Sequence, residues 1–94
     1  NLDNLEPGES AVYYTGMSLA QVGTEAGNTA WEMYHNGTAE LTQRRVPVAF
    51  TDDKGRTFTI SGFDYICTKR RVPVTGADLA SRQTYFNRLR NNGA

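Results

Sequence analysis

The chain has few of the residues from which chemical sites are usually built. Its 94 residues include one cysteine and one histidine. A single cysteine excludes an internal disulfide framework and a zinc site made of cysteines. The longest uninterrupted apolar run has four residues, so no segment resembles a membrane-spanning helix. The length allows one small domain with one hydrophobic core and excludes two.

Lysine and arginine are absent from residues 1–43, which carry six acidic side chains. Residues 44–94 hold all ten basic side chains against four acidic ones. The net charge of zero therefore conceals an acidic half and a basic half. Either the two halves pack together and neutralise each other, or the basic half meets nucleic acid or an acidic protein.

Hydrophobic periodicity predicts one small α+β domain with elements in the order β-α-β-β-α. In this arrangement an antiparallel hairpin sheet is packed by two helices. Residues 1–10 are polar and contain Pro7-Gly8, so we expect a mobile lead-in before a single domain at 11–94. The expected elements are a strand at 11–15, a helical turn at 18–22, a helix at 24–36, strands at 40–50 and 56–69, and a helix at 75–90.

Three local features refine the two long strands. Pro47 cannot donate a backbone hydrogen bond, which indicates an edge strand or a bend. Asp52–Gly55 has the composition of a hairpin turn, with a glycine where a positive φ is needed. Phe58 and Ile60 are expected to face inward. The apolar phase then changes at Ser61-Gly62, which predicts a β-bulge or a bend.

A short internal repeat gives the strongest functional signal. Gln43–Val48 (QRRVPV) is nearly repeated as Lys69–Val74 (KRRVPV). If the two long strands pair as a hairpin, both copies lie at its open end and five basic side chains come within reach of each other. Arginine suits phosphates and carboxylates alike, and aromatic rings stack on unpaired bases or lie in interfaces. The candidate binding residues are Arg44, Arg45, Lys69, Arg70, Arg71, Arg82, Arg88 and Arg90, with Tyr65 and Tyr85 as stacking or interface residues.

Catalytic chemistry finds little support in the sequence. His35 has no nucleophile or second titrating group at a useful spacing, so we expect a structural role near a helix end. Cys67 falls on the apolar face of a strand and is expected to be a small buried side chain. Asp52 and Asp53 stand beside Lys54 and indicate a solvated turn more than a cation site. No phosphate-loop, dinucleotide or metalloenzyme motif occurs, so we expect no enzyme, no cofactor and no metal.

Several short motifs resemble a family of small bacteriophage and prophage proteins. Val12–Ala20 (VYYTGMSLA) is similar to the family's Tyr-His-Thr-Gly-x-Leu-Ala opening, with a tyrosine at the histidine position. Ala30-Trp31, Leu41–Arg45 and Phe63–Ile66 are similar to its Ala-Trp helix, its Gln-Arg-Arg strand and its closing strand. The resemblance covers residues 12–71 and implies a phage origin and an accessory role in the cytoplasm of a bacterial host. The family has no assigned activity, so the resemblance supplies no catalytic residues.

These observations lead to an expected function of binding without catalysis. The leading interpretation is a phage-type accessory protein that binds nucleic acid through its arginine-rich hairpin and last helix. One alternative is a small inhibitor that binds an acidic host protein, and another is a virion or assembly component. No contact with a membrane is expected.

Overall fold

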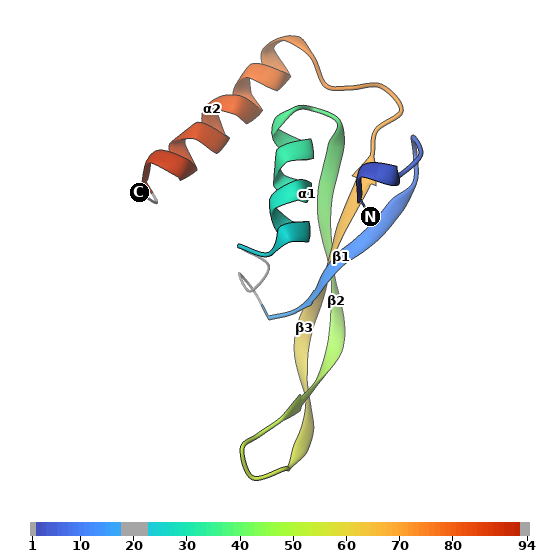
Figure 1. Ribbon diagram of the computed structural model, residues 1–94, viewed down its shortest axis with the longest axis vertical. Coiled ribbons are helices and arrows are strands. Elements are labelled where there is room, and N and C mark those ends of the chain that lie inside the picture. Colours follow the sequence, from blue (N-terminus) through green and yellow to red (C-terminus); the bar gives the residue numbers. More distant parts are fainter. Residues whose placement is uncertain (1, 18–22, 93–94) are drawn as a thin grey trace.

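The computed structural model describes residues 2–17 and 23–92 and has the predicted α+β architecture (Figure 1). Its elements are a 3-10 helix η1 (Leu2–Asn4), strand β1 (Ser10–Gly16), helix α1 (Glu25–His35), strands β2 (Ala39–Thr51) and β3 (Thr57–Lys69), and helix α2 (Gly76–Asn92). The predicted order β-α-β-β-α is confirmed, and α1, β1, β2 and β3 have bounds within one residue of those expected. The expected helical turn at 18–22 lies outside the described residues.

The three strands form one antiparallel sheet in the order β1-β3-β2. β1 and β2 therefore run in the same direction on either side of β3, and α1 connects them. β1 pairs with β3 only from Ser10 to Gly16, the latter opposite Phe63. β2 pairs with β3 over its full length, so the β2–β3 hairpin continues beyond the end of β1 as a two-stranded arm (Figure 1). We term residues 46–62 the distal ribbon.

The register shows why the apolar phase changes within β3. β2 and β3 pair without interruption, so the predicted bulge at Ser61-Gly62 is wrong. The register shifts instead within β1, between Val12 and Tyr14, its third and fourth described pairs with β3. Alternate residues of a strand face opposite sides of the sheet. Tyr65 and Cys67 lie on the side of α1, whereas Phe58 and Ile60 lie on the other face, so the expectation that these two face inward is also wrong.

The core lies between η1, α1 and the part of the sheet that β1 completes. Its buried residues are Leu2, Leu5, Ala30, Ala39 and Cys67. Leu2 and Leu5 are three residues apart, so a single 3-10 turn brings both to one side. A lead-in outside the domain is therefore the wrong description of residues 2–10. Cys67 is buried as predicted, and this burial raises the pKa of its thiol.

The turn of the hairpin is built around Asp52. Its carboxylate accepts backbone N–H groups from Arg56 and Lys54 and lies 2.9 Å from Nε of Arg56. The backbone bond from Arg56 is the largest cause of the lowered pKa of Asp52. Gly55 has a φ of +81°, a conformation that glycine adopts without strain. The predicted hairpin turn is confirmed, and the Asp52 carboxylate stabilises it by accepting hydrogen bonds from Lys54 and Arg56.

Candidate binding surface

The structure separates the two basic segments that the sequence predicted to meet. The position of the turn fixes the register, and Arg44 lies opposite Asp64 whereas Lys69 lies opposite Ala39. Five residues of extended strand, roughly 17 Å, separate these two rows. The two repeated segments therefore do not lie opposite each other in the hairpin register, and the predicted cluster of five basic side chains does not form.

Glu40 gathers two of the predicted binding residues. Its carboxylate lies 2.5 Å from both Arg70 and Arg82. Arg82 also donates to the carbonyl oxygens of Ala39 and Tyr34, and its guanidinium lies 4.1 Å from the centre of the Tyr34 ring. Burial raises the pKa of Glu40, but the hydrogen bonds from Arg82 and Arg70 outweigh it and the pKa is lowered. Arg70, which follows β3, and Arg82 on α2 thus bind the segment that joins α1 to β2. These ion pairs neutralise part of the acidic and basic charge within the molecule.

Arg44 and Arg45 lie on opposite faces of β2. Arg44 is 2.6 Å from Asp64, which also accepts a hydrogen bond from the Thr15 hydroxyl. The bonds from Arg44 and Thr15, in that order, lower the pKa of Asp64. On the face toward α1, the Arg45 guanidinium lies 5.5 Å from the centre of the Phe63 ring. Both arginines therefore have partners at the point where the distal ribbon begins, although the Arg44 side chain keeps 62% of its exposure.

The remaining predicted basic residues are scattered. Lys69 is half-buried at the end of β3. Arg71 is exposed, and its guanidinium lies against Gly8, where an added Cβ would come within 2.7 Å of it. Arg88 is exposed on α2, and the side chain of Arg90 lies outside the described residues. In the described part of the chain, Lys69 and Arg71 lie at the end of β3 that is distant from Arg44 in the strand register.

The two candidate tyrosines have different outcomes. Tyr65 is 6% exposed and its ring lies among those of Tyr13, Tyr14 and Phe63, so a role in stacking on a base or in an interface is wrong. Tyr85 is 50% exposed on α2 and, together with Arg88, lines an open hollow. Of the two candidate tyrosines, Tyr85 is the one whose ring is accessible to a partner.

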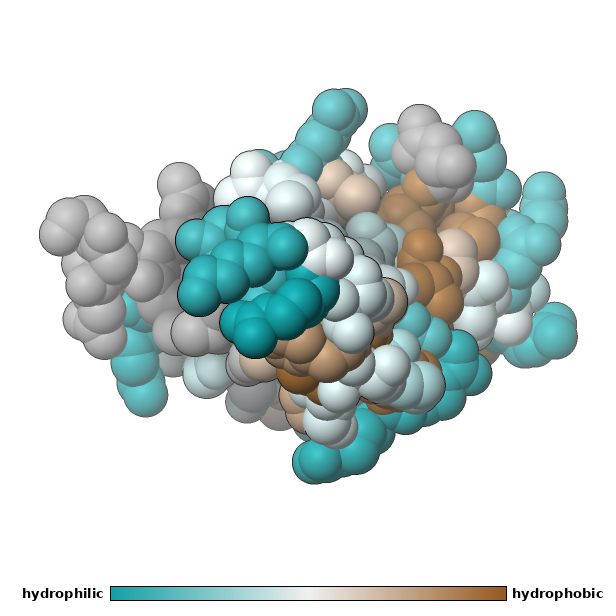
Figure 2. Space-filling model, turned by 90° about the horizontal axis from the view of Figure 1, so that it is seen from below, coloured by the Kyte–Doolittle hydropathy of each residue, from teal (hydrophilic) through white to brown (hydrophobic). Residues whose placement is uncertain are grey.

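The distal ribbon carries an apolar surface, which includes the two residues expected to face inward, Phe58 and Ile60. Phe50 and Phe58 lie opposite each other with ring centres 5.1 Å apart, and each is 46% exposed. Val48 and Ile60 form the next pair on the same face. We term these four residues the ribbon patch. Figure 2, which looks at the molecule from the tip of the ribbon, shows hydrophilic residues in front with hydrophobic surface beside them. The change of apolar phase at Gly62 was the sequence signal for this patch.

The two edges of the distal ribbon differ. Asp52 donates its N–H to the carbonyl of Arg56, so even-numbered residues bond across the hairpin and odd-numbered residues direct their backbone groups outward. On β2 the outward residues include Pro47, which has no N–H. On β3 they continue the row that pairs with β1, but no described strand lies beside them. These outward residues of β3 are Thr57, Thr59 and Ser61.

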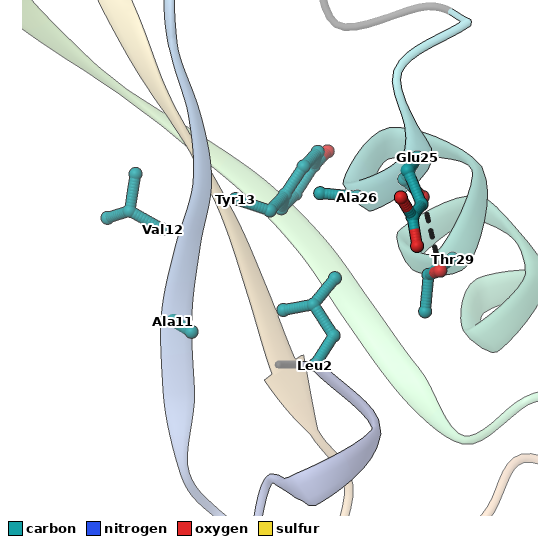
Figure 3. A pocket seen from close by; sticks show the side chains of 7 residues that line it. All are labelled: Leu2, Ala11, Val12, Tyr13, Glu25, Ala26 and Thr29. Atoms are coloured by element: carbon teal, nitrogen blue, oxygen red, sulfur yellow. Dashed lines mark hydrogen bonds between the residues drawn. The ribbon is translucent and has the colours of Figure 1, made fainter.

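A separate hollow of about 390 Å³ lies between η1, β1 and the first turn of α1 (Figure 3). Leu2, Tyr13 and Ala26 point toward it, and Val12 points away. Burial is the main cause of the raised pKa of the Tyr13 phenol. Glu25 adds a carboxylate to the wall. The lining is therefore mixed, with polar and apolar side chains in similar measure. Within residues 2–17 and 23–92, no three His, Cys, Asp or Glu side chains are grouped to hold a metal ion.

Comparison of the chain with protein-family models, curated proteins and solved structures found no match. In the part of the chain that the structure describes, no helix combines the length and apolarity needed to cross a bilayer. The distal ribbon, with its exposed patch and its open edge, is therefore the surface from which a function is inferred.

Proposed function

We propose that this protein acts by binding rather than catalysis, and that its ribbon patch docks into an apolar groove of a partner protein. One observation carries the proposal: Phe50 and Phe58, each 46% exposed, lie on the part of the β2–β3 hairpin that projects beyond the end of β1. Aromatic side chains on a protruding element supply most of the affinity in many protein interfaces. The resemblance to small phage proteins supports an accessory role with a partner in the bacterial host.

The charges around the patch also favour a protein partner. Affinity for nucleic acid depends on cations that are available to phosphates. Arg70 and Arg82 are held by Glu40, and at the tip of the ribbon Asp52 and Asp53 balance Lys54 and Arg56. Arg44, at the start of the ribbon, is paired with Asp64 but keeps 62% of its exposure, so a carboxylate at one end of the partner's groove can share it. We therefore propose an acidic rim on the partner surface.

A photo-crosslinking amino acid at position 50 tests this proposal. The matched control carries it at position 51, which is exposed on the opposite face of the same strand. Both variants are irradiated in nuclease-treated bacterial lysate, and the captured protein is then purified. It is titrated against the unchanged chain, Phe50→Ser and Thr51→Ser.

We expect one protein to be captured from position 50 and not from position 51. We expect Phe50→Ser to weaken its binding by tenfold or more, about 1.4 kcal/mol, and Thr51→Ser to leave it unchanged. Equal capture from both positions would contradict the proposal. So would binding to a nucleic acid duplex that Phe50→Ser leaves intact and that replacing Arg44 and Arg45 with alanine abolishes.

A further inference from the structure

We propose that the open edge of β3 in the distal ribbon pairs with the same edge of a second copy of this chain, across a two-fold axis at Thr59. The pairing uses the edge of the ribbon, whereas the proposed function uses its face. Neither requires the other, so each can fail alone.

The site continues a strand pairing that already exists in the molecule. β1 occupies the outer side of β3 as far as Phe63 and then ends. Beyond that point, residues 57–61 direct the same kind of backbone groups outward. The segment reads Thr-Phe-Thr-Ile-Ser, which is rich in strand-forming residues and has no charge or proline to block pairing. On the other edge of the ribbon, Pro47 is such a block.

The sequence of this edge fits itself when the axis passes through Thr59. Thr59 then lies opposite Thr59 of the second copy, and Thr57 lies opposite Ser61. Hydroxyl pairs of this kind already occur across the strands, as between Thr51 and Thr57 at 2.9 Å. On the face of the ribbon patch, Phe58 comes beside Ile60 of the second copy, which covers part of a ring that is 46% exposed in the monomer.

The surrounding geometry also favours a second copy. The two edges run antiparallel, so the two folded bodies lie at opposite ends of the paired ribbons. The paired segment is limited to residues 57–61, because the carbonyl of Gly16 lies against Gly62, and no like charges meet within it. The contact is smaller than the roughly 800 Å² per partner of a standard interface, so we expect a reversible dimer. Closed two-fold pairs are the commonest form of self-association.

Disulfide trapping tests the register. Outward residues such as Thr59 would form a hydrogen-bonded pair across the axis, with Cα atoms about 5.5 Å apart, which is within the span of a disulfide. Thr57→Cys is the matched control, because its two copies would be about 13 Å apart. We expect Thr59→Cys to form a linked dimer at least tenfold faster than Thr57→Cys under mild oxidation. The native Cys67 is fully buried and shared by both variants.

A proline pair tests the edge without added cysteine. Thr59→Pro removes an outward N–H from β3, and Ala49→Pro removes the corresponding N–H from the edge that Pro47 already blocks. We expect sedimentation at high concentration to show a dimer for the unchanged chain and for Ala49→Pro, and a folded monomer for Thr59→Pro. Circular dichroism checks that both variants fold.

Equal trapping of the two cysteine variants would overturn the proposal, as would an unchanged chain that stays monomeric at the highest soluble concentration. Loss of the dimer in folded Ala49→Pro would overturn it too. If the dimer is not found but crosslinking from position 50 succeeds, the proposed function stands and only the edge pairing fails. The reverse result would leave the edge pairing and remove the docking partner.

Discussion

The base of the hairpin and its distal ribbon consist of the same two strands, but different contacts stabilise them. At the base, β1 flanks β3 and α1 covers one face, so Tyr65 is 6% exposed and Cys67 is fully buried. In the distal ribbon the two strands have only each other, and Phe50 and Phe58 are each 46% exposed. A two-stranded ribbon is stabilised by its cross-strand pairs alone. Apolar residues in the first region therefore hold the fold together, and those in the second lie exposed on the arm, where we propose that a partner docks.

Alanine replacement of one aromatic residue in each region gives the largest expected difference. Tyr65→Ala leaves a cavity in the core, and we expect it to lower the free energy of unfolding by roughly 3 kcal/mol. Phe58→Ala, in the same strand, removes a half-exposed ring and should cost less than about 1 kcal/mol. Urea unfolding of the two variants measures both values. Equal losses would mean that the distal ribbon is as much a part of the core as the base.

The boundary between the two regions lies at Gly62. A Cβ at this position would come within 2.4 Å of Val48 Cγ2 and 2.9 Å of the Gly16 carbonyl oxygen. We expect Gly62→Ala to reduce stability by about 1–3 kcal/mol, because a well-packed site has no room for the added methyl group. The double variant with Val48→Ala should recover part of the loss and not all, since the Gly16 contact remains. Full stability of Gly62→Ala would show that β1 and the ribbon are not tightly joined here.

The ion pairs of Glu40, which belong to the base, predict a smaller effect that depends on pH. The pKa of Glu40 is lower in the folded chain than its ordinary value of 4.5, so the ion pairs add stability above that pH and lose it as the pH falls further. We expect Glu40→Gln to reduce stability at pH 7 by no more than about 1 kcal/mol, because the carboxylate is partly exposed. The difference from the unchanged chain should narrow below pH 4.5. A difference that is constant from pH 3 to 7 would contradict this role.

Local signals in the sequence predicted much of the fold. The turn at Asp52, the place of Pro47 on an edge strand and the burial of Cys67 each depend on one residue and its neighbours. All three are present in the structure. Leu2 and Leu5 escaped prediction because two leucines in a polar segment show no periodicity, and their burial depends on packing against α1 and β3.

The candidate site depended on information that local patterns do not hold. The predicted bulge at the change of apolar phase would have put Phe58 and Cys67 on the same face. Uninterrupted pairing puts them on opposite faces, and a local pattern does not tell which face a helix covers. The predicted basic cluster failed because the repeat of Arg44-Arg45 as Arg70-Arg71 does not follow the register that the turn imposes. The same register makes Arg44 a partner of Asp64. Long-range pairing thus decided which charges are neutralised and which apolar residues stay exposed.

Pro47 has a consequence for the size of any assembly. Because Pro47 takes one N–H from the outward edge of β2, that edge is a poor template for strand addition, and the arm has a valence of about one for it. Two copies that pair through β3 use up both open edges, and a third finds none. A long exposed ribbon of strand-forming residues is otherwise a template for open-ended fibres. In the proposed dimer, a single proline on the outer strand favours an association that stops at two copies.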